Sequence, residues 1–157
     1  SNARCYANWP KANFRAVTRL LPARFRLLRM FIQAVGHYLP TAVVPNEHFT
    51  RLNGLSDEWI IERTGIRERR KAGPDENTHT MAFAAVETLQ SLAPLTGVDL
   101  IVGATYTPYD TIVTLAHAVQ HYVAIPEIPT VTISSACSSL LNAIEIVEGY
   151  FATKKAR

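Results

Sequence analysis

The amino-acid sequence predicts an α/β protein whose mostly parallel sheet carries helices on both faces. Strand and helix patterns alternate from residue 30 onward, and the predicted strand 99–105 contains the continuous apolar run 100–104, as is typical of a strand buried on both faces. The chain of 157 residues, 48% hydrophobic and 18% charged, is long and apolar enough for a buried core. No apolar run reaches the roughly 18 residues that a membrane span requires.

Caps and breakers mark where the predicted elements end. Asn46 can cap the first helix, Ser56 or Asp57 can cap the second, and Gly65 ends it. The last helix is apolar on nearly every side, which predicts that it is buried. The expected strands are 31–36, 99–105 and 130–136, the expected helices are 46–52, 58–63, 78–92, 111–123 and 138–153, and the segments 37–45 and 66–77 are expected to be loop or turn.

Residues 30–157 are expected to form a partial domain, preceded by residues 1–29 as a leader of uncertain order. Ser-Asn-Ala at positions 1–3 is typical of a remnant of tag removal. Seven of the 16 basic residues lie in residues 4–29, which hold no acidic residue, so the other nine stand against 13 acidic residues. The basic charge is therefore local and does not indicate a nucleic-acid-binding body. We interpret 4–29 as a leader ahead of a native start at Met30, while a basic amphipathic helix, a transit peptide and a native extension packed on the domain stay open.

Cys137 is the candidate nucleophile. The stretch 130–140 predicts a strand, a sharp turn at Cys137 and then a helix. Unpaired N–H groups and the positive end of the helix dipole favour the thiolate, which is the form that attacks a thioester carbonyl. The small residues on either side leave room for an acyl chain and for N–H groups to reach an oxyanion. The competing interpretation is a buried, inert cysteine.

Three stretches of the sequence resemble ketoacyl-acyl-carrier-protein synthase III, a family of thiolase-like condensing enzymes. They are 36–40 (GHYLP), 56–69 (SDEWIIERTGIRER) and 135–139 (SACSS), in the order and at the separation that the family has. The resemblance covers about residues 30–157 and implies the truncated N-terminal half of a thiolase-like fold. It also implies an acyltransferase of fatty-acid or related polyketide synthesis, in which Cys137 accepts an acyl group from acyl-CoA before decarboxylative condensation with a malonyl-carrier protein.

The resemblance further implies roles for three residues on the predicted second helix. Trp59 would stack on the adenine of coenzyme A, and Arg63 and Thr64 would lie near the same nucleotide. An indole offers a flat apolar face and a guanidinium binds phosphate, so the roles are chemically reasonable. Without the resemblance, Trp59 is as readily a packing residue, and Arg63 is more readily a solvated charge.

The same reasoning sets expectations for cofactors, partners and setting. No tightly bound cofactor and no metal is expected, and acyl-CoA enters as a substrate. The expected partners are acyl-CoA, an acyl carrier protein, and either a second copy of the chain or a complementing C-terminal half, with no nucleic acid. Cys5 and Cys137 make neither a disulfide framework nor a metal cluster, which favours a reducing, cytoplasmic setting.

The sequence departs from the family in two respects. Serines surround Cys137 where the family mostly has alanine and glycine, which suggests an altered primer pocket and a specialised relative. The family's catalytic histidine and asparagine lie in a C-terminal half, so the chain is expected to end within a domain and to be inactive on its own. A non-catalytic or split binding or dimerisation half and a specialised starter-loading relative stay open. Five histidines match neither catalytic motif and are expected to be structural or surface groups: His37, His48, His79, His117 and His121.

Overall fold

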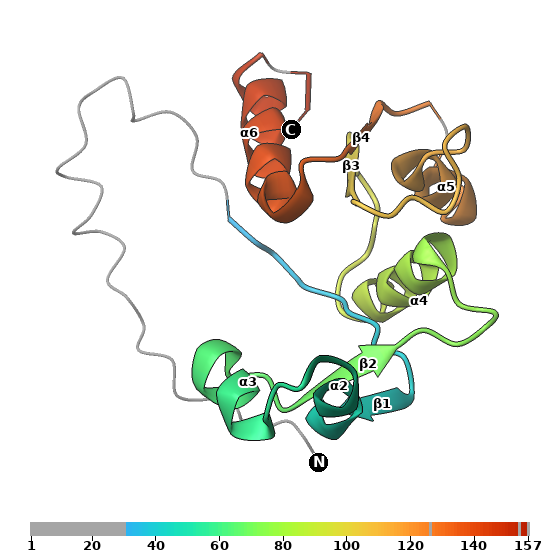
Figure 1. Ribbon diagram of the computed structural model, residues 1–157. Coiled ribbons are helices and arrows are strands. Elements are labelled where there is room, and N and C mark those ends of the chain that lie inside the picture. Colours follow the sequence, from blue (N-terminus) through green and yellow to red (C-terminus); the bar gives the residue numbers. More distant parts are fainter. Residues whose placement is uncertain (1–30, 126, 154, 157) are drawn as a thin grey trace, which may run out of the picture. The chain divides into compact units, whose positions relative to one another are not determined.

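The computed structural model describes residues 31–125, 127–153 and 155–156. These residues belong to one compact unit and are drawn in colour in Figure 1. The leader predicted for residues 1–29 lies outside the described residues and stays a prediction. None of the described helices is long and apolar enough to cross a membrane.

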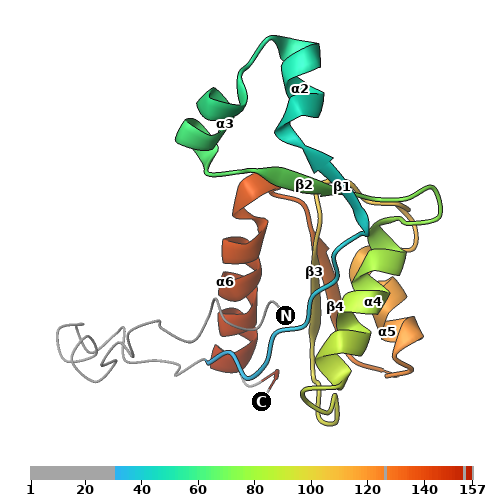
Figure 2. The same cartoon turned by 90° about the horizontal axis from the view of Figure 1, so that it is seen from below.

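A parallel pair of strands forms the centre of the unit. Strand β3 (Ile101–Ala104) pairs in parallel with β4 (Thr130–Ile133), with Ile101 opposite Thr130. Helix α5 (Leu115–Tyr122) connects the two strands and packs against both, and α6 (Ser139–Ala152) packs against β3. Figure 2 shows α6 on one side of the strands and α5 on the other. The predicted parallel sheet with helices on both faces is therefore confirmed, although each strand is shorter than predicted.

Helix α5 lies unusually close to strand β3 because Gly103 has no side chain. A Cβ at Gly103 would lie 2.9 Å from the Ala116 nitrogen and 3.2 Å from Thr132 Oγ1. The Ala116 N–H donates to that same hydroxyl oxygen at 3.0 Å, so β4 supplies the hydrogen bond that the helix's own N-cap residue does not. Ala116 is fully buried at this contact. The glycine and the threonine together set the depth at which α5 packs.

Helix α4 (Thr78–Gln90) packs beside α5 on the same side of the strands. Its N-cap residue is Asn77, directly before the predicted start of the helix at residue 78. The Asn77 side chain accepts from the Thr80 N–H at 3.1 Å, and Thr80 Oγ1 accepts from the Asn77 N–H at 2.9 Å, which completes a capping box. Phe83 of α4 stacks on Tyr122 of α5 with ring centroids 4.2 Å apart.

A second, antiparallel pair of strands contradicts the prediction of loops at 37–45 and 66–77. Strand β1 (Ala42–Pro45) pairs with β2 (Glu68–Lys71), and helices α2 (Asn46–Asn53) and α3 (Asp57–Thr64) lie between them in the sequence. The sequence of β2, ERRK, is entirely charged and has no apolar alternation. The pairing partner, and not the hydrophobic pattern, makes this segment a strand.

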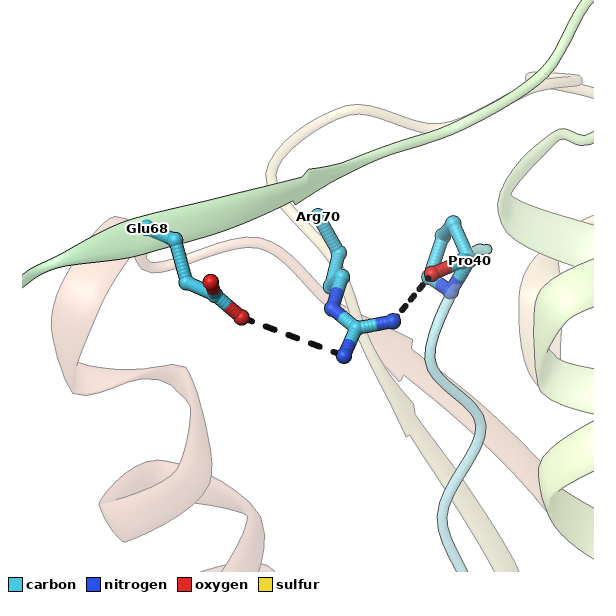
Figure 3. A network of polar contacts seen from close by, with 3 residues as sticks. All are labelled: Pro40, Glu68 and Arg70. Atoms are coloured by element: carbon cyan, nitrogen blue, oxygen red, sulfur yellow. Dashed lines mark hydrogen bonds and ion pairs between the residues drawn. The ribbon is translucent and has the colours of Figure 1, made fainter. Parts of the chain in front are cut away.

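The strand predicted at 31–36 is wrong, because residues 31–40 form neither helix nor strand. Phe31 and Ile32 are each 81% exposed, and neither sheet of the described residues includes this segment. Gly36 lies directly against α4, where a Cβ would be 2.4 Å from the Ala85 carbonyl oxygen. Figure 3 shows the end of the segment, where Arg70 of β2 donates to the Pro40 carbonyl at 3.2 Å.

The prediction that the last helix is buried is also wrong for this chain. In α6, Leu140 and Leu141 are 69% and 68% exposed, although β3 covers another side of the helix. Burial needs a second surface, and the described residues provide one on only part of the helix. The apolar sequence thus identifies a helix with an uncovered apolar side.

Candidate functional site

Cys137 lies in a short turn between β4 and α6. The turn is a 3₁₀ segment (Ala136–Ser138) that leads directly into α6 at Ser139. Ala136 has φ = 48°, in the left-handed region that residues other than glycine rarely adopt. Cys137 is a free and exposed thiol. The predicted strand, sharp turn and helix are confirmed, with the strand ending at Ile133, three residues before its predicted end at Ala136.

The position of Cys137 gives the thiol two chemical advantages. Its exposure makes the sulfur accessible from solvent. The turn also precedes the N-terminus of a 14-residue helix, where unpaired N–H groups and the positive end of the dipole favour an anion. The competing interpretation is wrong about burial, because Cys137 is exposed, and the reactivity of the thiol stays a prediction.

The serines around Cys137 bind the backbone of the turn. The Ser135 N–H donates to Ser139 Oγ at 2.9 Å, and Ser139 Oγ donates to the Ala136 carbonyl at 2.9 Å. Ser138 Oγ donates to the Ser135 carbonyl at 2.7 Å. These hydroxyls are therefore engaged in the turn, which gives the serines a role other than lining a primer pocket.

Trp59 and Arg63 lie one helical turn apart on α3. The Ser56 side chain caps this helix by accepting from the Trp59 N–H at 3.1 Å, and Ile60 is its buried anchor at 4% exposed. Trp59 is 43% exposed, and the Arg63 guanidinium carbon lies 5.4 Å from the centroid of its ring. The structure thus brings together an accessible aromatic face and a cation, two groups that suit a nucleotide.

Thr64 closes the C-terminus of α3. Its hydroxyl donates to the Ile60 carbonyl at 2.6 Å and accepts from the Ile66 N–H at 3.1 Å. Gly65 then ends the helix with φ = 70°. The one proton of the Thr64 hydroxyl is donated to the backbone at the end of the helix that carries Trp59 and Arg63, and its position near a nucleotide stays a prediction.

Asn46 is a buried residue that sequence reasoning assigned to a different role. It was expected to cap α2, but Pro45 is the N-cap residue, and the Asn46 side chain turns to the other elements and is 0% exposed. Its Nδ2 donates to Asp57 Oδ1 at 2.7 Å and to the Ile66 carbonyl at 2.8 Å, while Arg69 Nη1 donates to its Oδ1 at 2.7 Å. Asn46 therefore ties both ends of α3 to β2. In the sequence, the only sign of this role is that the three partners of Asn46 all lie within the stretch 57–69.

The loop between β3 and α5 is ordered by Asp110. The Asp110 carboxylate accepts from the N–H groups of Ile112 at 2.7 Å and Val113 at 3.1 Å. These two hydrogen bonds hold the pKa of Asp110 below its ordinary value. His79 of α4 is buried against this loop, with its ring 5.4 Å from that of Tyr109.

No metal cluster marks the site in the part of the chain that the structure describes. No three of its histidine, cysteine, aspartate and glutamate side chains are grouped to hold a metal ion. A hollow of about 440 Å³ lies at the C-terminal end of α5, lined by His117, His121 and Glu127 among others. It is bordered by neither Cys137 nor Trp59. Among the described residues, no hydrogen bond, ion pair or ring contact joins α3 to the turn at Cys137.

Comparison with known proteins gives a consistent set of relatives. No protein-family model matches the chain. The β-ketoacyl-[acyl-carrier-protein] synthase III of Rhodospirillum centenum is 39% identical over 132 residues, which are 83% of this chain and 41% of that protein. The same enzyme of Caulobacter vibrioides is 35% identical over 127 residues, 80% of this chain and 39% of that protein.

Solved structures agree with the sequence relatives. The β-ketoacyl-[acyl carrier protein] synthase III of Thermus thermophilus superposes with a TM-score of 0.73 at 35% identity, over 81% of this chain and 40% of that one. A priming β-ketosynthase of the R1128 polyketide pathway superposes with a TM-score of 0.68 at 30% identity, over 78% of this chain and 37% of that one. The expected resemblance and the expected thiolase-like α/β fold are confirmed, and this chain spans about 40% of the length of the relatives it matches.

Proposed function

We propose, from its likeness to β-ketoacyl-[acyl-carrier-protein] synthase III, that this chain is the nucleophile-bearing N-terminal half of a condensing enzyme of that kind. The observation that carries the proposal is the turn at Cys137. An exposed thiol at the start of a long helix, held by a residue with φ = 48°, is suited to attack an external thioester.

In the proposed first step, the Cys137 thiolate attacks the carbonyl carbon of an acyl-CoA. The new C–S bond forms as the bond to coenzyme A breaks, and the coenzyme A thiolate leaves and takes up a proton. In the parent enzyme, a malonyl-carrier protein would then lose carbon dioxide, and its carbanion would displace Cys137 to release a ketoacyl product. The resemblance assigns that second step to a histidine and an asparagine of the C-terminal half, so this chain by itself would stop at the acyl-enzyme.

The first test measures acylation by intact mass. The chain with Cys5→Ser is incubated with acetyl-CoA, and we expect a gain of one acetyl group that Cys137→Ser abolishes. A chain that keeps its far-UV circular dichroism but gains no acetyl group would contradict the acylating role. Release of a ketoacyl product after addition of malonyl-carrier protein would contradict the claim that this half stops at the acyl-enzyme.

Trp59 and Arg63 are proposed to bind the nucleotide end of acyl-CoA. The support is the half-exposed indole with the guanidinium above it. Trp59→Ala is expected to weaken acylation by acetyl-CoA roughly tenfold or more, since stacking on one base contributes about 1–3 kcal/mol. A short acetyl thioester of N-acetylcysteamine carries no nucleotide, so its reaction with Cys137 should be unchanged. Equal losses with both donors would show that the substitution disturbs the fold instead.

A second candidate is a non-catalytic or split half that pairs with another chain. The observation in its favour is the uncovered apolar side of α6, where Leu140 and Leu141 are exposed. Phe31 and Ile32 are also exposed, in the segment before β1. Its partner would be a second copy or a complementing C-terminal half. This function predicts a folded chain whose Cys137 is not acylated, which the mass measurement separates from the first candidate.

The choice of primer and pathway belongs to the same proposal. Likeness to a priming β-ketosynthase supports a starter-loading relative as a variant of the first candidate. The serines beside Cys137 support that variant less than the sequence suggested, because Ser138 and Ser139 bond to the backbone. We propose acyl-CoA and an acyl carrier protein as partners, no tightly bound cofactor, and a cytoplasmic setting.

A further inference from the structure

We propose that Ser139 is a positioning residue for Cys137: its buried hydroxyl holds the strained turn in the conformation that presents the thiol. The inference rests on the proposed function only for the chemical use of that thiol. The hydroxyl itself is defined by two hydrogen bonds and by its burial, and its effect on the turn can be measured without an acyl donor.

The Ser139 hydroxyl bridges the turn through two hydrogen bonds to the backbone. Its Oγ accepts from the Ser135 N–H and donates to the Ala136 carbonyl, both at 2.9 Å. The Ser135 N–H lies before Ala136 in the chain, and the Ala136 carbonyl belongs to the peptide group that follows it, so one hydroxyl ties together the two ends of the Ser135–Ala136 segment. Ser139 is 7% exposed, and water has little access to replace these bonds.

These two hydrogen bonds are needed because Ala136 adopts a conformation that its own side chain disfavours. A φ of 48° brings Cβ close to the following carbonyl group, and residues other than glycine hold it only where the surroundings enforce it. Gly65 reaches φ = 70° at the end of α3 without such enforcement, because it has no Cβ. Cys137 follows Ala136 directly, so relaxation of Ala136 to negative φ would turn the Cys137 side chain away from its present direction.

The serine hydroxyls do not serve the ordinary purpose of serines at a helix start. Ser138 is the N-cap residue of α6, yet its side chain makes no capping hydrogen bond to that helix. Instead, Ser138 Oγ donates backward to the Ser135 carbonyl at 2.7 Å, and Ser139 also bonds backward. Both hydroxyls therefore act on the turn that precedes the helix.

The test measures the rate at which iodoacetamide alkylates Cys137, at one fixed pH and in a Cys5→Ser background. Ser139→Ala is expected to slow alkylation about fivefold, since a net hydrogen bond changes a conformational equilibrium by about that factor. Adding Ala136→Gly to Ser139→Ala should restore most of the rate, because glycine tolerates positive φ without the hydrogen bonds of the Ser139 hydroxyl. Thr153→Ala is the matched control: it removes a hydroxyl bonded to the backbone at 2.8 Å at the other end of α6 and should leave the rate unchanged.

Each outcome decides the proposal. An unchanged rate in Ser139→Ala would overturn it, and so would a slowed rate that Ala136→Gly fails to restore, since the loss would then not run through Ala136. We expect Ser139→Ala and the double variant Ser139→Ala/Ala136→Gly to have the same melting temperature but different alkylation rates. A loss of fold stability alone would not give that combination. If the alkylation pattern holds but acetyl-CoA leaves Cys137 unmodified, the proposed function fails while the positioning role stands.

Discussion

Asn46 offers a quantitative test of how the Trp59 helix is held in place. Its side chain is 0% exposed and makes three hydrogen bonds, at 2.7, 2.8 and 2.7 Å, two of them with the charged groups of Asp57 and Arg69. A neutral hydrogen bond contributes about 1 kcal/mol net and one to a charged group about 1.5–3 kcal/mol. Asp57 and Arg69 are half-buried and can recover part of their solvation, so we expect Asn46→Ala to lower the free energy of unfolding by about 3 kcal/mol.

Urea unfolding followed by far-UV circular dichroism measures this loss. For a chain of this size, 3 kcal/mol corresponds to a decrease of about 1.5 M in the urea midpoint. Asn142→Ala is the matched control: Asn142 is a half-buried asparagine of α6, and its replacement should change stability by less than about 0.5 kcal/mol.

Asn46→Asp separates hydrogen bonding from size. It keeps an acceptor for Arg69 but loses both donated bonds and faces the Asp57 carboxylate, so it should be at least as unstable as Asn46→Ala at neutral pH. A loss below about 1 kcal/mol in Asn46→Ala would refute the reasoning, because burial and three short bonds would then contribute no more than one ordinary hydrogen bond.

Two further predictions concern glycines and pH. Gly103→Ala should lower the free energy of unfolding by about 2 kcal/mol, because its Cβ would lie 2.9 Å from the Ala116 nitrogen. A Cβ at Gly149 in α6 would meet nothing within 4 Å, so Gly149→Ala should raise the free energy of unfolding by about 0.5–1 kcal/mol. The two variants should therefore shift the urea midpoint in opposite directions. The pKa of Glu76 is lowered from 4.5, first by the Gly73 N–H and then by the Tyr38 hydroxyl, which both donate to its carboxylate. The stability from these bonds is fully present above pH 4.5 and is lost as the pH falls through the lower folded pKa. Glu76→Gln should therefore lose less stability between pH 4.5 and that lower value, and an equally steep acid limb would contradict the assignment.

The candidate site was predicted unevenly from the sequence. The turn at Cys137 could be predicted because a strand, a run of small residues and a helix fix its position, and the resemblance predicted acyl-CoA as the substrate of the thiol. Trp59 and Arg63 followed from the resemblance, and their mutual contact follows from a spacing of four residues on a helix. Ser139 was noticed only as an unusual neighbour of Cys137. Its function depends on a hydroxyl reaching back four residues, which composition and periodicity do not encode.

By itself the sequence determined the elements whose causes are local. Caps such as Ser56, breakers such as Gly65 and the continuous apolar run before Thr105 set α3 and β3 within a few residues, because each depends on neighbouring groups in the chain. The tertiary structure decided which segments are strands, because a strand needs another strand to pair with. The charged segment 68–71 is a strand because β1 pairs with it, whereas the apolar segment 31–36 pairs with no strand among the described residues and is therefore not one.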